Sequence, residues 1–137
     1  MNYAHTCIRV KDLEASIAFY EKALGYKVTR EKDHSADGFK LVYLALEGDK
    51  AELELTYNIG HGAYDIGDGY GHVAVESDDL EGDHARMKAE GFDVTDLMGL
   101  PGEAPRYFFV TDPDGYKPKS FAEGFKTKAV NHSLRAD

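Results

Sequence analysis

Two histidines and one glutamate have the residue types that bind a divalent metal. His5 begins the segment HTCIRV, Glu54 lies within AELELTYN, and His72 begins HVAVE. Each segment alternates apolar and polar residues, which is typical of a strand with one buried face, and the three side chains fall on the opposite, open faces. Two imidazoles and a carboxylate suit zinc, nickel, cobalt or iron. The sequence therefore predicts a metal site formed by these three residues.

The two histidines also begin two copies of one sequence unit. The copies are HTCIRVKDLEASIAFYEKALGYKVT and HVAVESDDLEGDHARMKAEGFDVT. The shared residues are His5, Asp12, Leu13, Glu14, Gly25, Val28 and Thr29, which match His72, Asp79, Leu80, Glu81, Gly91, Val94 and Thr95. Taken singly, a strand histidine is more often packed or solvated, and Glu52 with Glu54 could form a solvated polar face. The repeat favours a shared role for the histidines, because it places them at the same point of two equivalent modules.

Each unit is expected to fold as β-α-β-β-β. Asp12 and Asp79 suit the N-terminal cap of a helix, and Gly25 and Gly91 suit its C-terminal end. The further strands are expected over residues 26–30, 40–46 and 51–57 in the first unit and 92–97, 106–111 and 116–121 in the second. We expect one α+β domain over residues 1–125, with modules at about 1–58 and 70–123 and a flexible tail over 126–137.

Three other histidines are expected to have no ligand role. His84 lies on the inner stripe of the second helix, at the position that Ile17 holds in the first, so a packed or partly exposed side chain is expected. His34 and His132 lie in polar segments and should be solvated. The glycine-rich segment NIGHGAYDIGDGYG precedes a strand, so it is interpreted as a connector between the modules and no phosphate loop is expected.

Charge and cysteine content limit the class of partner. The chain has 16 Lys and Arg against 25 Asp and Glu, a formal net charge of -9, which disfavours nucleic acid because phosphate binding needs a basic surface. A single cysteine, Cys7, excludes an internal disulfide framework, and no signal peptide or long apolar run is visible near the N-terminus. We expect a cytoplasmic protein that binds a small molecule or a protein and no membrane.

With these motifs the chain resembles glyoxalase I, or lactoylglutathione lyase, of the vicinal oxygen chelate superfamily. The resemblance runs from HTCIRVKDLEASIAFYEKALG through ELTYNIG and GYGHVAV to DPDGYK, and it ends at about residue 117. It implies a fold in which two tandem β-α-β-β-β modules form curved mixed sheets around a metal and substrate pocket. It also implies a homodimer whose sites are built from strands of both subunits.

The resemblance implies four metal-ligand positions, and one of them has changed. Three are His5, Glu54 and His72; the fourth, the second residue after DPDGYK, is a glutamate in glyoxalases and Lys119 in this chain. A protonated amine has no lone pair to donate and repels a divalent ion, although three ligands can still hold a catalytic metal. We therefore expect a weakened metal site.

Two nearby carboxylates are poor substitutes for the missing ligand. Glu52 shares the face of Glu54 but lies about 7 Å along the strand. Glu123 lies about 13 Å beyond Lys119, and would reach the site only if Pro118 broke the strand and shifted its register.

The implied activity is the isomerisation of the hemithioacetal of methylglyoxal and glutathione to S-lactoylglutathione, a detoxification of methylglyoxal. Nickel, cobalt or zinc would be the metal, glutathione the co-substrate and Glu54 the catalytic base. Arg9 and Asn58 match the family positions that contact glutathione, although Arg9 could equally form a plain salt bridge. The loop LMGLPGEAPR is less basic than in many glutathione-using members, and Glu103 would repel a glycyl carboxylate, so a different thiol is an alternative.

Two other functions stay open at this point. A non-catalytic binder of a small molecule or metal in the same superfamily is favoured by Lys119. Iron-dependent ring-cleaving oxygenation uses two histidines and one carboxylate. It ranks last, because that class takes its carboxylate from the position that Lys119 holds.

Overall fold

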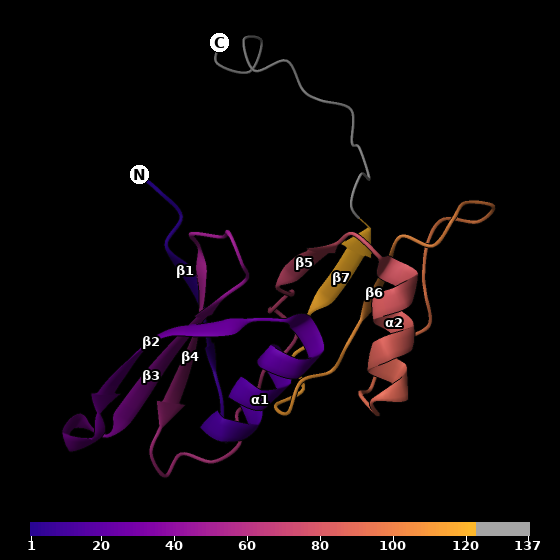
Figure 1. Cartoon of the computed structure of the whole chain (residues 1–137). Helices are drawn as coiled ribbons and strands as arrows, with labels where there is room; N and C mark the ends of the chain where they lie inside the picture. The colour runs from indigo at the N-terminus through magenta and orange to yellow at the C-terminus, as the bar shows by residue number, and fades with distance from the viewer. Residues whose placement is uncertain (123–137) are drawn as a thin grey trace, which may run out of the picture.

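Two mixed sheets, each with one helix packed against it, make up residues 1–122, the part of the chain that the computed structural model describes (Figure 1). The first sheet has the order β1-β4-β3-β2 and contains β1 (His5–Arg9), β2 (Lys27–His34), β3 (Phe39–Ala45) and β4 (Glu52–Asn58). The second has the order β5-β7-β6 and contains β5 (Ala74–Ser77), β6 (Tyr107–Phe109) and β7 (Lys119–Ala122). The helices are α1 (Leu13–Leu24), α2 (Leu80–Ala89) and the short 3₁₀ helix η1 (Ser35–Asp37). The predicted α+β fold is confirmed.

Both long helices begin as the sequence predicts, and α1 ends at the predicted glycine, whereas the C-cap of α2 is Glu90, one residue before the predicted Gly91. The side chain of Asp12 accepts a hydrogen bond from the Ala15 N–H, and that of Asp79 accepts one from the Gly82 N–H. Gly25 ends α1 with a φ of 79°, a left-handed conformation that glycine adopts without steric cost. No helix within residues 1–122 is long and apolar enough to cross a membrane.

The second module has fewer paired strand residues than predicted. Instead of the strand expected over residues 92–97, only two isolated bridges form, at Val94 and at Met98. The strand expected over 116–121 begins at Lys119, because Pro118 has no N–H for the ladder and the Tyr116 N–H is hydrogen-bonded to the Asp112 carboxylate instead. The prediction of both strand extents was therefore wrong, although β6 and β7 occupy the expected segments.

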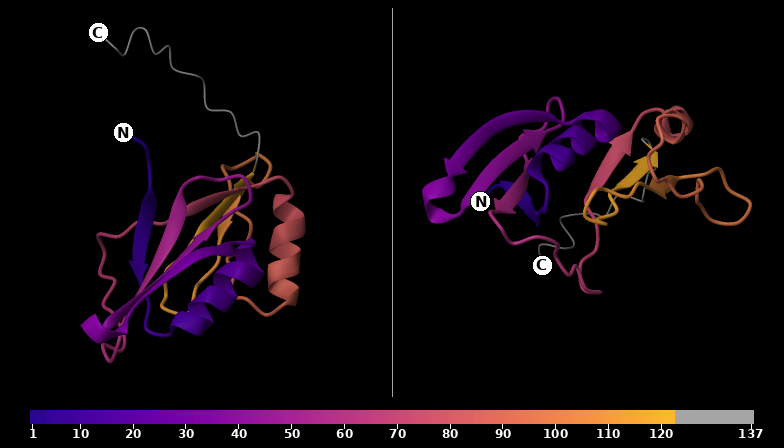
Figure 2. Two further views of the ribbon diagram at one scale, coloured as in Figure 1. Left: turned by 60° about the vertical axis from the view of Figure 1, so that its left-hand side comes forward. Right: turned by 90° about the horizontal axis from the view of Figure 1, so that it is seen from below.

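One hydrophobic core contains residues from both modules, and α1 lies between the first sheet and the second module (Figure 2). Phe19 of α1 packs edge-on against Phe92, with ring centroids 5.6 Å apart. Val10 and Leu55 from the first module and Phe108 from the second are completely buried in the same cluster. The duplicated units therefore share their apolar surface.

The DPDG turn, residues 112–115, joins the second module to the first. The Tyr20 hydroxyl donates to the buried Asp112 carboxylate at 2.7 Å, and the Tyr116 hydroxyl donates to the carbonyl oxygen of Arg9 at 2.9 Å. Burial raises the pKa of Asp112, and hydrogen bonds from Tyr20 and from the turn offset only part of this effect. The motif is thus a structural contact between the modules as well as a turn.

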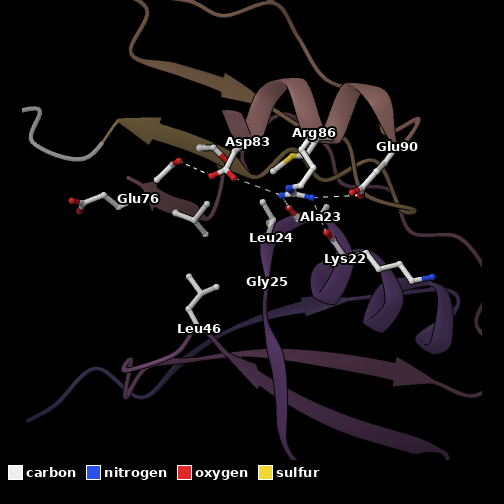
Figure 3. A pocket seen from close by; sticks show the side chains of 13 residues that line it. Lys22, Ala23, Leu24, Gly25, Leu46, Glu76, Asp83, Arg86 and Glu90 are labelled. Carbon is white, nitrogen blue, oxygen red and sulfur yellow. Dashed lines mark hydrogen bonds and ion pairs between the residues drawn. The ribbon is translucent and has the colours of Figure 1, made fainter. Parts of the chain in front are cut away.

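A second contact between the modules is made by Arg86 of α2 (Figure 3). Its guanidinium donates to the carbonyl oxygens of Lys22 and Ala23, at 3.1 and 2.8 Å, and so satisfies the C-terminal end of α1. The same group lies 3.9 Å from Asp83 and 3.5 Å from Glu90. These residues border a cavity of about 490 Å³, and Arg86 already interacts with the helix end and with both carboxylates.

Candidate active site

Two of the three predicted ligands lie side by side on the open face of the first sheet. The parallel pairing of β1 with β4 brings His5 Nε2 to 3.2 Å from Glu54 Oε2. The His5 side chain is 36% exposed, whereas Glu54 as a whole residue is only 8% exposed. Metal–ligand bonds to histidine and carboxylate are about 2 Å long, so atoms at this separation can share one ion.

Hydrogen bonds hold the Glu54 carboxylate in place. The Thr56 hydroxyl donates to Oε1 at 2.8 Å, and Tyr43 and Cys7 also bond to the carboxylate. Burial acts to raise the pKa of Glu54, but the hydrogen bonds from Tyr43, Thr56 and Cys7, together with the charge of His5, outweigh it and hold the pKa below its ordinary value. Glu54 is therefore ionised at neutral pH, as a ligand or base must be.

Sequence reasoning missed these three supporting residues. Strand alternation had placed Cys7 on the open face with His5, and Thr56 on the open face with Glu54, so it indicated proximity without a role. Tyr43 lies opposite Glu54 in the β3–β4 pairing, and that register was not predicted.

Glu52 is already engaged in another interaction and is unsuited to replace the missing ligand. Its carboxylate lies 2.9 Å from an Arg30 nitrogen, and hydrogen bonds from Thr29 and Arg30 lower its pKa. Arg9, by contrast, forms no ion pair with any residue in the described range 1–122, so the plain salt-bridge alternative finds no partner there.

The remaining ligand positions belong to the second module, one just before β5 and one in β7. His72 precedes β5, is exposed, and packs edge-on against Phe109 with ring centroids 5.5 Å apart. Lys119 is half-buried in β7, with its Nζ 4.5 Å from the centre of the Tyr107 ring. A cation over an aromatic face is a favourable arrangement, so this ammonium group is accommodated without a carboxylate.

Strand register shows that Lys119 is the counterpart of Glu54. In the first sheet, His5 lies two residues before the β1 residue that pairs with Glu54. In the second sheet, His72 lies two residues before the β5 residue that pairs with Lys119. The two modules therefore present the same pair of positions, occupied by histidine and glutamate in one and by histidine and lysine in the other.

No single point gathers three metal-binding side chains among residues 1–122. His5 and Glu54 form one half of the predicted set, and His72 stands apart in the second module, just before β5. Convergence of all three within one chain is therefore not found in this range, and convergence across a subunit interface stays a prediction. Glu123 and His132, along with the tail expected over 126–137, lie outside the described residues.

Two of the three histidines expected to have no ligand role, His84 and His34, lie within the described residues and make other contacts. The Nε2 atom of His84 is 2.7 Å from the Thr95 carbonyl oxygen, and its ring packs edge-on against Phe108. His34 stacks on Phe39 with ring centroids 4.8 Å apart. Both contacts are structural.

Comparison with known proteins shows the family of the chain. The family model of the Glyoxalase/Bleomycin resistance protein/Dioxygenase superfamily matches residues 2–117. The lactoylglutathione lyase of Haemophilus influenzae is 39% identical over 132 residues, covering 94% of this chain and 97% of the relative. That of Neisseria meningitidis serogroup B is 41% identical over 120 residues, covering 85% and 87%.

Solved structures show the same relationship. The trypanothione-dependent glyoxalase I of Leishmania major has a TM-score of 0.79 at 36% identity, covering 90% of this chain and 87% of that one. Glyoxalase I from Zea mays has a TM-score of 0.78 at 32% identity, covering 87% of this chain and 43% of that longer chain. An antibiotic-binding protein from Streptomyces, 20% identical with a TM-score of 0.70, shares the fold. This chain belongs to the glyoxalase superfamily and is a homologue of the bacterial lactoylglutathione lyases.

Proposed function

We propose that this protein is a glyoxalase I-like lyase that converts the hemithioacetal of methylglyoxal and glutathione to S-lactoylglutathione. The observation that carries the proposal is the His5–Glu54 pair, 3.2 Å apart and held by hydrogen bonds on the open face of the first sheet. The lactoylglutathione lyases of two bacteria, 39% and 41% identical to this chain, support the same reaction.

The side chains fit a divalent metal at three of the four family positions. His5 Nε2 and Glu54 Oε2 supply one half of the site and the imidazole of His72 the other, while the ammonium of Lys119 does not fit a ligand role. Three protein ligands leave positions open for water or substrate. A bound nickel, cobalt or zinc ion would polarise the hemithioacetal oxygens and lower the pKa of the carbon-bound proton.

The residues of this chain then divide the remaining tasks. The ionised Glu54 takes the carbon-bound proton and returns it to the adjacent carbon, as base and then as acid. Hydrogen bonds from Tyr43 and Thr56 orient its carboxylate. Arg9 and Asn58 are the last residues of β1 and β4, and they bind the glutathione part of the substrate.

Glutathione is the proposed thiol. The concern that Glu103 repels its glycyl carboxylate is reduced, because Glu103 forms an ion pair with Arg106 at 2.5 Å. The loop that carries both residues projects away from the body of the molecule (Figure 1).

We also propose that the site forms between two copies of the chain. His5 and Glu54 lie in the first module, and His72 and Lys119 belong to the second. A symmetric dimer could therefore form two equivalent sites, each with the first-module half of one subunit and the second-module half of the other. Mixing Glu54→Gln with His72→Ala subunits tests this arrangement. A shared site predicts recovered turnover, because each mixed dimer has one site free of both substitutions, and no recovery would contradict sharing.

The activity itself is tested with purified protein loaded in turn with nickel, cobalt and zinc. Formation of S-lactoylglutathione from methylglyoxal and glutathione is the expected result, and chelator-treated protein is the control. Metal and glutathione binding without turnover under every condition would instead support a non-catalytic binder, the function that Lys119 favours.

A further inference from the structure

The segment that connects the modules places a tyrosine against the end of β4. Asn58 Nδ2 donates a hydrogen bond to the Tyr64 hydroxyl at 2.9 Å, and both residues are partly buried. The Tyr64 ring is stacked on His61, with centroids 3.9 Å apart and planes inclined by 9°. The His61 N–H in turn donates to the Asn58 carbonyl oxygen at 3.1 Å. Asn58 is therefore held through both its backbone and its side chain.

Tyr64 also lies beside the second proposed contact for the thiol. It lines a cavity of about 200 Å³ together with Arg9 of β1. The same cavity is bordered by Tyr116, whose hydroxyl fixes the backbone of Arg9. Tyr64 thus touches Asn58 and faces the space next to Arg9.

The hydrogen bond to Tyr64 decides which part of the Asn58 amide is available to a ligand. A side-chain amide has two N–H donors and one oxygen acceptor. One N–H of Asn58 is used by Tyr64, and the Oδ1 atom has no partner among residues 1–122. Arg9 pairs with Thr56, two residues before Asn58 on β4, and forms no ion pair within residues 1–122. A free acceptor and an arginine at the ends of paired strands suit a ligand group that carries an ammonium next to a carboxylate.

We propose that Tyr64 is a positioning residue that holds the Asn58 amide with Oδ1 toward the ligand, and thereby selects thiols with a free α-ammonium group. This inference rests on the proposed use of glutathione, whose γ-glutamyl end has such a group. Tyr64 contributes no atom to the reaction, and its effect is on ligand binding.

Tyr64→Phe removes the hydroxyl and keeps the ring that stacks on His61. We expect the metal-loaded full-length variant to bind S-hexylglutathione about tenfold more weakly in calorimetry, the effect of one lost hydrogen bond. KM for the hemithioacetal should rise by a similar factor, with kcat changed less than about twofold. Tyr57→Phe is the matched control, since Tyr57 precedes Asn58 and its hydroxyl has no hydrogen bond within the described residues.

A double-mutant cycle separates positioning from a general structural role. In an Asn58→Ala background, Tyr64→Phe should cause no further loss of affinity, because the hydroxyl then has nothing to orient. The S-hexyl derivative of N-glutaryl-cysteinylglycine, which lacks the α-ammonium, should bind the wild type weakly and be affected little by Tyr64→Phe. The single variant Asn58→Ala keeps the stacking of Tyr64 on His61. Its affinity for S-hexylglutathione therefore measures the contribution of the Asn58 amide itself.

Three results would overturn the inference: unchanged affinity of Tyr64→Phe, an equal loss in the Asn58→Ala background, or no binding of S-hexylglutathione to the wild type. If instead S-hexylglutathione binding follows the expected pattern while methylglyoxal and glutathione give no product, the positioning role stands and the proposed reaction fails.

Discussion

The open faces of the two modules carry opposite chemistry at equivalent positions. In the first sheet, Glu54 receives hydrogen bonds from Tyr43, Thr56 and Cys7. Strand register gives their counterparts around Lys119 as Phe109, Phe121 and Ala74. None of the three hydrogen-bonding side chains around the carboxylate has a hydrogen-bonding counterpart around Lys119.

The difference follows from what each charge requires. A carboxylate that is mostly buried needs hydrogen-bond donors, because an unpaired buried charge is costly. An ammonium over the Tyr107 ring needs none, and the apolar neighbours of Lys119 are compatible with it. The two faces therefore differ in several positions together, and within residues 1–122 only the first sheet has a metal-binding pair in place.

The largest expected effect comes from Glu54→Gln, which removes the charged member of that pair. We expect loss of the bound metal and a fall in kcat/KM of about 10³-fold, as for a lost general base. Metal analysis and the methylglyoxal assay measure it. Glu52→Gln, on the same strand but paired with Arg30, is the control. Normal metal content and turnover in Glu54→Gln would show that the first sheet is not the active half.

Lys119→Glu should make the second face resemble the first. A carboxylate at this position would be a direct ligand and is expected to raise metal affinity by at least about 10- to 100-fold, the range found for groups that only support a ligand. Phe109→Tyr, added to it, should raise the affinity further by supplying the counterpart of the Tyr43 hydroxyl. Lys117→Glu changes the charge equally at an exposed position and is the control; the same gain there would indicate a general effect of charge.

Tyr43→Phe gives the first sheet the residue type that Phe109 provides in the second, and its expected effect is smaller. Loss of this donor raises the pKa of Glu54, so on acidification protons displace the metal at a higher pH than in the wild type. We expect a three- to tenfold lower metal affinity at neutral pH, about the effect of one hydrogen bond, measured by competition with a chelator across pH. Tyr107→Phe on the other sheet should leave the pH at which the metal is lost unchanged. An equal shift in that variant would contradict a specific role of Tyr43.

The smallest effect concerns the core sides of the same strands. Leu55, next to Glu54, is fully buried, and its counterpart next to Lys119 is Ser120, 1% exposed with no hydrogen-bond partner for Oγ within residues 1–122. Removing an unpaired buried hydroxyl with Ser120→Ala should raise the free energy of unfolding in urea by about 1 kcal/mol. Ser77→Ala should lower it, since that hydroxyl donates to Asp83 at 2.6 Å. Destabilisation by Ser120→Ala would mean that the hydroxyl has a partner in solution.

Local patterns predicted most of the fold and half of the candidate site. Alternation predicted the side of the sheet on which His5 and Glu54 lie, and the repeat predicted both helices with their N-terminal caps. Alternation does not specify which strand lies opposite, so the contact of Tyr43 with Glu54 was missed. The late start of β7 follows from Pro118, a cue that was visible in the sequence but whose effect on the ladder was underestimated.

The hydrogen bond from Tyr116 to the Arg9 carbonyl, together with that from Tyr20 to Asp112, ties each copy of the repeat to the other. Heat or denaturant that loosens one copy must break these links and expose the common apolar interior, so we expect a single cooperative melting transition. A chain cut in the connector should not yield two independently folding halves, even though the two halves repeat the same sequence unit.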